Sequence, residues 1–393
     1  MSIKFPYSRP EMTAADVAAA TRVLESQFLT QGPEVSGFEA ALAARLGCRE
    51  VVVCSNGTAA LHLAYMAAGL GPDRGLLTTP VTFLATANAA RMCGAPVAFA
   101  DVDPATGNID VGAVERALTN AGSRIGVIAP VHLAGRPCDM PALRALADRH
   151  GCLLVEDACH ALGAVYGDPA DGAVPVGACA HSDMAVFSFH AIKHVAMGEG
   201  GAVTTNDPAL ARTMRLLRSH GLDRDPESWT DPPEPDAPWY YEMRTLGWNY
   251  RATDLQCAIG TSQLARLDDS LRERRRIAAA YDRHLAGLNH VRPPVPPTDP
   301  AAHAWHLYAV AIDFAAVGKT RGTVMRELAA RGIGSQVHYI PLHHQPYYRD
   351  VGAAVLDGAE AYYAQTLSIP MYPALSDDDV AEIAAGLRSV LGA

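Results

Sequence analysis

The chain has 393 residues, of which 49% are hydrophobic, and its formal net charge at neutral pH is −10. Such a chain can bury a large core, and no block of Lys or Arg is long enough to follow a phosphate backbone, so nucleic acid is excluded as a partner. The start carries no apolar stretch of signal-peptide length, and no run approaches the roughly 18 apolar residues of a membrane span. We therefore expect a cytoplasmic globular protein, with its eight scattered cysteines reduced.

The first half of the chain alternates helical and β-rich segments. After a helix expected over residues 13–26, strands are predicted over 50–55, 75–80, 96–101, 124–131, 152–157, 184–189 and 200–207. Helices are predicted between them, over 58–70, 82–94, 110–121 and 139–151. Continuous apolar strands that alternate with helices are typical of an α/β fold, in which a parallel or mostly parallel sheet is covered on both faces. Ligands of such sheets bind beyond the carboxyl ends of the strands.

The pattern changes from about residue 221. Residues 221–243 are rich in Asp and Pro, which predicts a long surface loop, and a long helical pattern follows over 252–288. The segment 289–303 breaks this pattern, and the rest mixes a strand, a helix and turns. We expect a large domain over 1–272 and a smaller α+β domain over 273–393.

Two charged residues stand out at strand ends. Asp157 ends the strand "CLLVED", where it could cap the next helix or pair with a cation. Lys193 follows the strand "MAVFSF" in the apolar segment "FSFHAIKHV". A lysine at a strand end is more often a solvated surface residue, but apolar neighbours disfavour the charged amine and make it a candidate Schiff-base nucleophile.

The segment "CSNGTAALHLA" runs from a strand through Gly57 and Thr58 directly into a helix. The free N–H groups of such a helix start form an anion seat, to which Ser188 could add a hydroxyl. Phe83, in "TTPVTFLATANAA", could cover a flat ring, although a Phe there could equally belong to the core. An acid, an imine-forming lysine, a phosphate seat and an aromatic face are the parts that hold pyridoxal phosphate (PLP), so this cofactor is predicted.

At these residues the sequence resembles the DegT/DnrJ/EryC1/StrS family of PLP-dependent sugar aminotransferases. The resemblance covers essentially the whole chain and is carried by "LTQGPEVSGFEAAL", "SNGTAALHLA", "TTPVTFLATANAA", "VEDACHALGA", "VFSFHAIK", "EGGAVTTND", "RSHGL", "GWNYRATDLQCAIGTSQL" and "QVHYIPLHHQPYY". It implies the fold type I transferase architecture, which is that of aspartate aminotransferase.

The resemblance also implies residue roles. Lys193 would form the imine and shuttle protons, and Asp157 would pair with the pyridinium nitrogen. His160 stands where the family has Gln or His near the phenolic oxygen, Phe83 would stack on the ring, and Asn249 would reach the phosphate of the neighbouring subunit in a homodimer. The remaining residues would hold the phosphate (Gly57, Thr58 and Ser188) or line the sugar pocket (Thr30, His338, Tyr339 and His343).

Within the family, "SFHAIK", "RSHGL" and "QVHYIPLHHQPYY" look most like the members that act in pseudaminic acid synthesis. Those enzymes aminate C4 of UDP-2-acetamido-2,6-dideoxy-β-L-arabino-hex-4-ulose with glutamate as donor. The expected product is UDP-4-amino-4,6-dideoxy-N-acetyl-β-L-altrosamine. The alternative within this chemistry is another nucleotide-linked keto-sugar, dTDP- or UDP-linked and aminated at C3 or C4.

Other interpretations fit the residues less well. A sugar dehydratase of the same fold would carry His in place of Lys193, and a non-catalytic regulator would need a DNA-reading module. The segment "QVHYIPLHH" offers only adjacent histidines and a pair five residues apart, a poor ligand spacing, so no metal is expected. The residue that binds the donor carboxylate stays open among Arg9, Arg244 and Arg251.

Overall fold

The computed structural model describes residues 3–121, 124–167, 172–234, 237–295, 302–349 and 356–392. The large part of the molecule is built on a seven-stranded sheet with the order β1-β9-β8-β5-β4-β2-β3. Its strands are β1 (Glu50–Cys54), β2 (Gly75–Thr78), β3 (Val97–Phe99), β4 (Ile125–Ala129), β5 (Leu153–Asp157), β8 (Met184–Ser188) and β9 (Gly201–Thr205). All seven predicted strands are therefore present. The pairs among β8, β5, β4, β2 and β3 are parallel, whereas β9 runs antiparallel to both of its neighbours.

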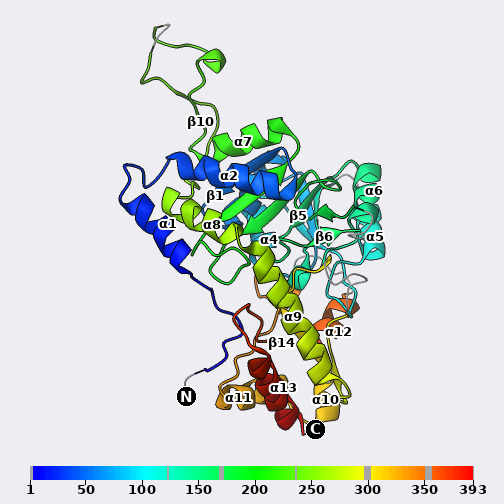
Figure 1. Ribbon diagram of the computed structural model, residues 1–393. Coiled ribbons are helices and arrows are strands. Elements are labelled where there is room, and N and C mark those ends of the chain that lie inside the picture. The colour runs from blue at the N-terminus through cyan, green and yellow to red at the C-terminus, as the bar shows by residue number, and fades with distance from the viewer. Residues whose placement is uncertain are drawn as a thin grey trace.

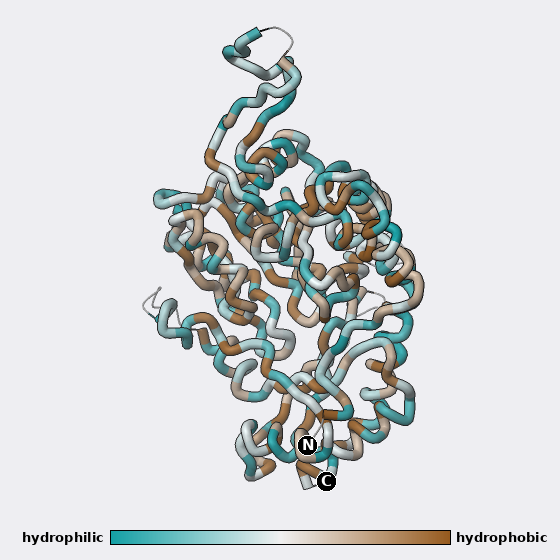
Figure 2. The backbone as a smooth tube through the Cα atoms, turned by 90° about the vertical axis from the view of Figure 1, so that its left-hand side faces the viewer, coloured by the Kyte–Doolittle hydropathy of each residue, from teal (hydrophilic) through white to brown (hydrophobic). Residues whose placement is uncertain are grey.

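Both faces of this sheet are buried, as the continuous apolar strands predict. Successive residues of β1 point to opposite sides: Val51 and Val53 belong to one apolar cluster, and Val52 belongs to the other. The helices around the sheet are α2 (Pro33–Leu46), α3 (Gly57–Ala67), α4 (Ala85–Met92), α5 (Val111–Ala121), α6 (Met140–His150) and α7 (Pro208–Arg218). Figure 1 shows them packed around the strands, and apolar segments of the tube gather in the body of the molecule in Figure 2. No described helix is long and apolar enough to cross a bilayer.

The long helical pattern over 252–288 forms two helices, α8 (Asp254–Leu264) and α9 (Leu267–Leu285), where one was expected. The break falls at Arg266, which forms an ion pair with Asp16 at 2.7 Å and donates to the backbone carbonyl of Glu11. It lets α8 pack on α1 (Ala14–Leu24) and α2, while α9 packs on the C-terminal helix α13 (Asp377–Leu391).

A second, smaller unit follows. Its antiparallel sheet contains β12 (Val291–Arg292), β13 (Tyr308–Ile312) and β14 (Thr366–Ile369), and its helices are α10 (Phe314–Val317), α11 (Arg321–Ala330) and α12 (Asp357–Gln365). A third apolar cluster joins this sheet to α9, α11 and α13. We infer that the domain boundary lies within α9, in keeping with a division into residues 1–272 and 273–393. Of the predicted break over 289–303, residues 296–301 lie outside the described residues.

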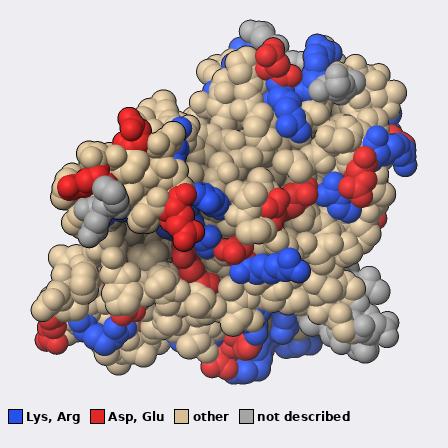
Figure 3. All heavy atoms as spheres, turned by 90° about the horizontal axis from the view of Figure 1, so that it is seen from above, with Lys and Arg blue, Asp and Glu red and all other residues tan. Residues whose placement is uncertain are grey.

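Residues 221–234 and 237–243 of the predicted loop form a ribbon that projects from the large domain (Figure 1). Its base is the short antiparallel pair β10 (Leu222–Asp223) and β11 (Glu242–Met243), and a single turn of 3₁₀ helix covers Pro226–Ser228. Two further short strands, β6 (Val165–Tyr166) and β7 (Val174–Pro175), pair beside the large sheet. On the face in Figure 3, acidic and basic side chains are interspersed.

Candidate active site

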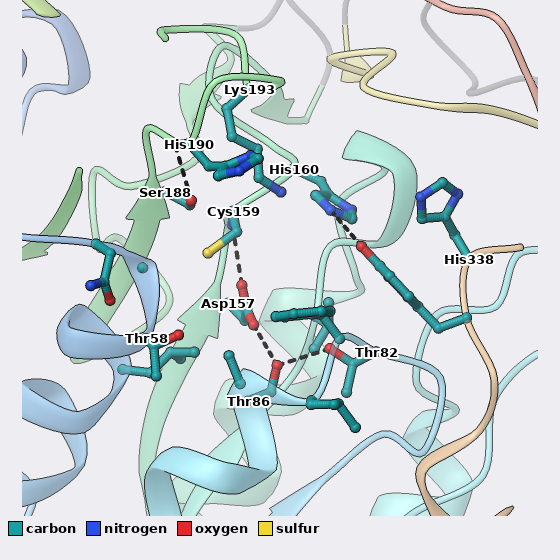
Figure 4. Close-up of a pocket in the computed structure, with 18 of the residues that line it drawn as sticks. Thr58, Thr82, Thr86, Asp157, Cys159, His160, Ser188, His190, Lys193 and His338 are labelled. Atoms are coloured by element: carbon teal, nitrogen blue, oxygen red, sulfur yellow. Dashed lines mark hydrogen bonds between the residues drawn. The ribbon is translucent and has the colours of Figure 1, made fainter. Parts of the chain in front are cut away.

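A cavity of about 880 Å³ lies beyond the carboxyl ends of β5 and β8. A parallel sheet binds its ligands at this edge, because the strands end there together and the following loops form the walls. Nine of the predicted site residues line this cavity: Gly57, Thr58, Phe83, Asp157, His160, Ser188, Lys193, His338 and Tyr339. The fold thus brings together residues that are up to 282 positions apart (339 minus 57) in one place (Figure 4).

Lys193 lies on the loop that links β8 to β9. This loop is held by backbone hydrogen bonds: the N–H of Lys193 donates to the carbonyl of His190 at 2.8 Å, and that of Phe189 donates to Gly200 at 2.8 Å. Burial lowers the pKa of Lys193 below its usual 10.5, although Cys159 and Asp157 act in the opposite direction. The environment therefore favours the neutral amine, the form that acts as a nucleophile or a base.

Asp157 is 5% exposed at the end of β5. One carboxylate oxygen accepts a hydrogen bond from the hydroxyl of Thr86 at 2.7 Å, and the other accepts one from the N–H of Cys159 at 3.2 Å. The hydroxyls of Thr86 and Thr82 lie 2.8 Å apart, so Thr82 supports the Thr86 hydroxyl that orients the carboxylate (Figure 4). A buried, oriented carboxylate that faces a cavity can pair with a cationic ring nitrogen.

The anion seat forms at the start of α3. Asn56 caps this helix by accepting from the N–H of Ala59 at 2.8 Å, which leaves the N–H groups of the first turn to face the cavity. A Cβ atom added to Gly57 would lie 2.9 Å from the Cβ of Ser188, so only glycine lets these two segments approach so closely. The positive end of the helix dipole, the free N–H groups and the Ser188 hydroxyl suit a phosphate.

An aromatic and imidazole wall closes the other side. The Nε2 of His160 lies 3.1 Å from the Tyr339 hydroxyl, and the rings of Phe83 and Tyr339 are 6.1 Å apart. Burial and the nearby Lys193 lower the pKa of His160 well below its usual value, and burial lowers that of His338 to about 3. Both imidazoles are therefore neutral, and His160 can act as a hydrogen-bond partner without adding charge.

Sequence reasoning missed several residues of the site. Thr82 and Thr86 lie in the quoted segment "TTPVTFLATANAA", where two hydroxyls one helical turn apart were the available signal. His306 comes from the small domain and its ring packs against that of His160 at a tilt of 32°, with ring centroids 4.3 Å apart. No spacing along the chain could indicate that contact, because 146 positions (306 minus 160) separate the two residues.

Three predicted residues do not line the cavity of this chain. Thr30 forms an isolated bridge with Thr253, Asn249 forms one with Ser219, and His343 pairs with Glu360. None of the three candidate arginines lines it either. Arg9 lies over the ring of Tyr372, Arg244 pairs with Glu242 on the ribbon, and the Nε of Arg251 is buried without a hydrogen-bond partner.

Comparison with known proteins agrees with this arrangement. The family model for the DegT/DnrJ/EryC1/StrS aminotransferase family matches residues 10–388. The chain belongs to this family. It is a sugar aminotransferase that depends on PLP. Among curated proteins, the spore coat polysaccharide biosynthesis protein SpsC of Bacillus subtilis (strain 168) is 39% identical over 393 residues, which cover 98% of this chain and 97% of SpsC.

Solved structures of the family superpose over nearly the whole chain. PseC of Helicobacter pylori, an aminotransferase involved in the biosynthesis of pseudaminic acid, matches with a TM-score of 0.88 and 31% identity, and covers 99% of each chain. Spr1654 of Streptococcus pneumoniae in its PLP form matches with a TM-score of 0.87 and 26% identity, and covers 98% of each chain. The fold type I architecture is thereby confirmed.

The residues that line the cavity of this chain fit PLP. The close approach of Gly57 to Ser188 leaves backbone N–H groups for the phosphate, and the Nδ1 of His160 is buried without a partner beside the cavity. Asp157 and Lys193 supply the acid and the amine that the ring nitrogen and the aldehyde need. Each polar group of PLP therefore finds a chemically matched partner among residues of this cavity.

Proposed function

We propose that the enzyme transfers an amino group from glutamate to C4 of a nucleotide-linked 4-keto-6-deoxy sugar. Its product would be UDP-4-amino-4,6-dideoxy-N-acetyl-β-L-altrosamine, for pseudaminic acid synthesis. The observation that carries the aminotransferase chemistry is that Lys193 and Asp157 line one cavity with the start of α3. The choice of sugar is supported by the 31% identity to PseC over 99% of both chains.

SpsC supports a second candidate, because it is 39% identical and acts in the synthesis of a spore coat polysaccharide. Under this alternative the same chemistry acts on another nucleotide-linked keto-sugar. A dehydratase reaction is disfavoured, because the imine-forming position holds Lys193.

When bound, PLP supplies an electron-withdrawing ring that stabilises negative charge at the donor Cα. The chain's own groups perform the remaining tasks. The Asp157 carboxylate fixes the position of the ring nitrogen and keeps it protonated, while the first turn of α3 and Ser188 hold the phosphate. The Nζ of Lys193, whose pKa is lowered by burial, accepts the proton from the donor Cα. A single well-placed amine of this kind contributes about 10²–10⁴-fold to a rate.

We also propose that the active enzyme is a homodimer with shared sites. Lys193 is the only Lys or Arg among the described residues that line the cavity. A nucleotide diphosphate and a dicarboxylic donor both need cationic partners, so a second chain must supply them. Large apolar side chains are exposed in three places: on and near the ribbon (Trp239, Tyr241, Met243 and Leu246), beside the cavity (Phe83 and Leu84) and on the segment before α2 (Phe28 and Leu29). Such a surface is typical of a contact with another chain.

The test combines spectroscopy with product analysis. The purified enzyme should show the absorbance of a PLP imine, which glutamate shifts to that of pyridoxamine phosphate. A panel of UDP- and dTDP-linked 3- and 4-keto-sugars, with product identified by NMR, then determines the substrate. Lys193→Ala should fold and lose turnover. Turnover close to wild type in this variant would refute the proposed role of Lys193, and amination of a different sugar would favour the second candidate.

A further inference from the structure

Three side chains converge outside the cofactor cavity. The Nε2 atoms of His343 and His344 each lie 2.6 Å from the same carboxylate oxygen of Glu360, and the three ligand atoms lie within 4.8 Å of one another. Adjacent residues of a 3₁₀ turn point about 120° apart around its axis, so two neighbouring imidazoles do not usually meet at one point. Here both rings turn their Nε2 toward one oxygen.

The two elements that carry these residues are firmly held. His343 and His344 lie on the 3₁₀ turn Leu342–His344, in which the side chain of Leu342 is fully buried and its N–H donates to the carbonyl of Pro80 at 2.8 Å. Glu360 lies in the first turn of α12, where two successive N–H groups donate to the carboxylate of Asp101 at 2.8 and 2.9 Å. The convergence is therefore built into the backbone of both elements.

We propose that His343, His344 and Glu360 bind a divalent transition-metal ion of the zinc or nickel type. Two imidazole nitrogens and one carboxylate oxygen form a ligand set that such ions prefer, and solvent can supply the remaining ligand. Ligand atoms around a tetrahedral ion with bonds near 2.0 Å lie about 3.3 Å apart, so the oxygen needs to move by less than about 1 Å from each nitrogen.

The exposure of the cluster suits an ion that enters from solvent. The side chains of His343, His344 and Glu360 are 20%, 35% and 49% exposed. The Nδ1 of His343 is buried without a partner, so the contact of its Nε2 is the one that orients the ring. The sequence by itself predicts no metal, because the segment "QVHYIPLHH" alone has a poor ligand spacing. In the structure the third ligand group of the cluster, Glu360, comes from a separate helix.

A bound ion would join two parts of the structure. The segment that carries the histidines also contains Tyr339, Ile340 and Gln345, which line the cofactor cavity. Glu360 belongs to α12, whose Tyr362 hydroxyl donates to the carbonyl of His338 at 3.3 Å. The ion would therefore fasten the segment that forms one wall of the cavity to α12. This inference does not depend on which sugar the enzyme aminates.

The experiment is a calorimetric titration in which Ni²⁺ is added to the PLP-loaded enzyme, after a chelator has removed any metal already bound. Nickel is used because it favours imidazole over the free thiols of the chain. Wild type should bind one ion per chain at this site. Glu360→Gln and His344→Ala should each weaken binding by about tenfold or more, because each removes a direct ligand. His284→Ala removes an exposed imidazole elsewhere on α9 and should change the affinity less than twofold.

Glu360→Gln keeps the size of the side chain and an oxygen that can accept from an imidazole. A role limited to hydrogen bonding predicts unchanged nickel affinity in this variant. Equal affinity in Glu360→Gln, His284→Ala and wild type would overturn the proposal, as would no binding by wild type. If His344→Ala fails to fold, anomalous scattering from nickel-soaked crystals decides the matter: an ion between the two histidines supports the site, and density elsewhere refutes it.

Discussion

Replacing Thr86 by Val should weaken PLP binding and lower the stability of the apo enzyme. The Thr86 hydroxyl donates to Asp157 at 2.7 Å, and the other donors found for this carboxylate among the described residues both belong to Cys159, its N–H and its thiol. Thr86 and Asp157 are only 1% and 5% exposed, so a Val side chain at position 86 would leave this carboxylate oxygen with little access to water. A hydrogen bond to a charged group contributes about 1.5–3 kcal/mol.

We therefore expect the free energy of unfolding of the apo enzyme to fall by about 1.5–3 kcal/mol. PLP affinity should fall by roughly 10- to 100-fold if the same loss appears in cofactor binding, because the carboxylate is no longer held toward the ring nitrogen. Urea unfolding measures the first effect, and absorbance titration with PLP measures the second. Thr86→Ser keeps the donor and should restore PLP affinity. If Thr86→Val binds PLP within twofold of wild type while Asp157→Ala does not, the hydroxyl does not orient the carboxylate.

Three further predictions test other parts of the structure. Lys193→Met should stabilise the apo enzyme at pH 7, because the pKa of Lys193 is lowered by burial. The gain in the free energy of unfolding should shrink as the pH approaches 10.5, where the unfolded chain loses the same proton. Urea unfolding measured at a series of pH values checks this. Burial alone would raise the pKa of Glu156, but donors from His132, Ser182 and Tyr166 lower it. The stabilising effect of the ionised Glu156 should thus be lost as the pH falls below about 4.5. Glu156→Gln should lower the free energy of unfolding by about 3 kcal/mol at neutral pH, and it should reduce the dependence of that free energy on pH below about 4.5, as measured by urea unfolding. If Asn249 serves the neighbouring subunit, mixing inactive Lys193→Ala and Asn249→Ala chains should restore about a quarter of wild-type turnover, whereas action within one chain restores none.

Much of the fold could be predicted from the sequence. The seven strands of the large sheet were identifiable because apolar runs of four to six residues, bounded by turn residues, have few alternatives in a chain of this composition. Lys193 and Asp157 could be recognised because each follows such a strand, and a parallel sheet brings its carboxyl ends to one edge. The phosphate seat was equally local, since Gly57 and Thr58 connect a strand directly to a helix.

Only the tertiary structure decided the contacts between distant segments. At the break between α8 and α9, Arg266 pairs with Asp16, which lies 250 positions away (266 minus 16) and leaves no trace in a local helical pattern. His306 packs against His160 across 146 positions (306 minus 160), and Glu360 meets two histidines that lie on a separate element of the chain. Hydrophobic periodicity specifies which face of an element is buried, but it carries no information about which distant side chain shares that buried space. The strands and their terminal residues were therefore set by local sequence, whereas the partners of those residues were set by packing.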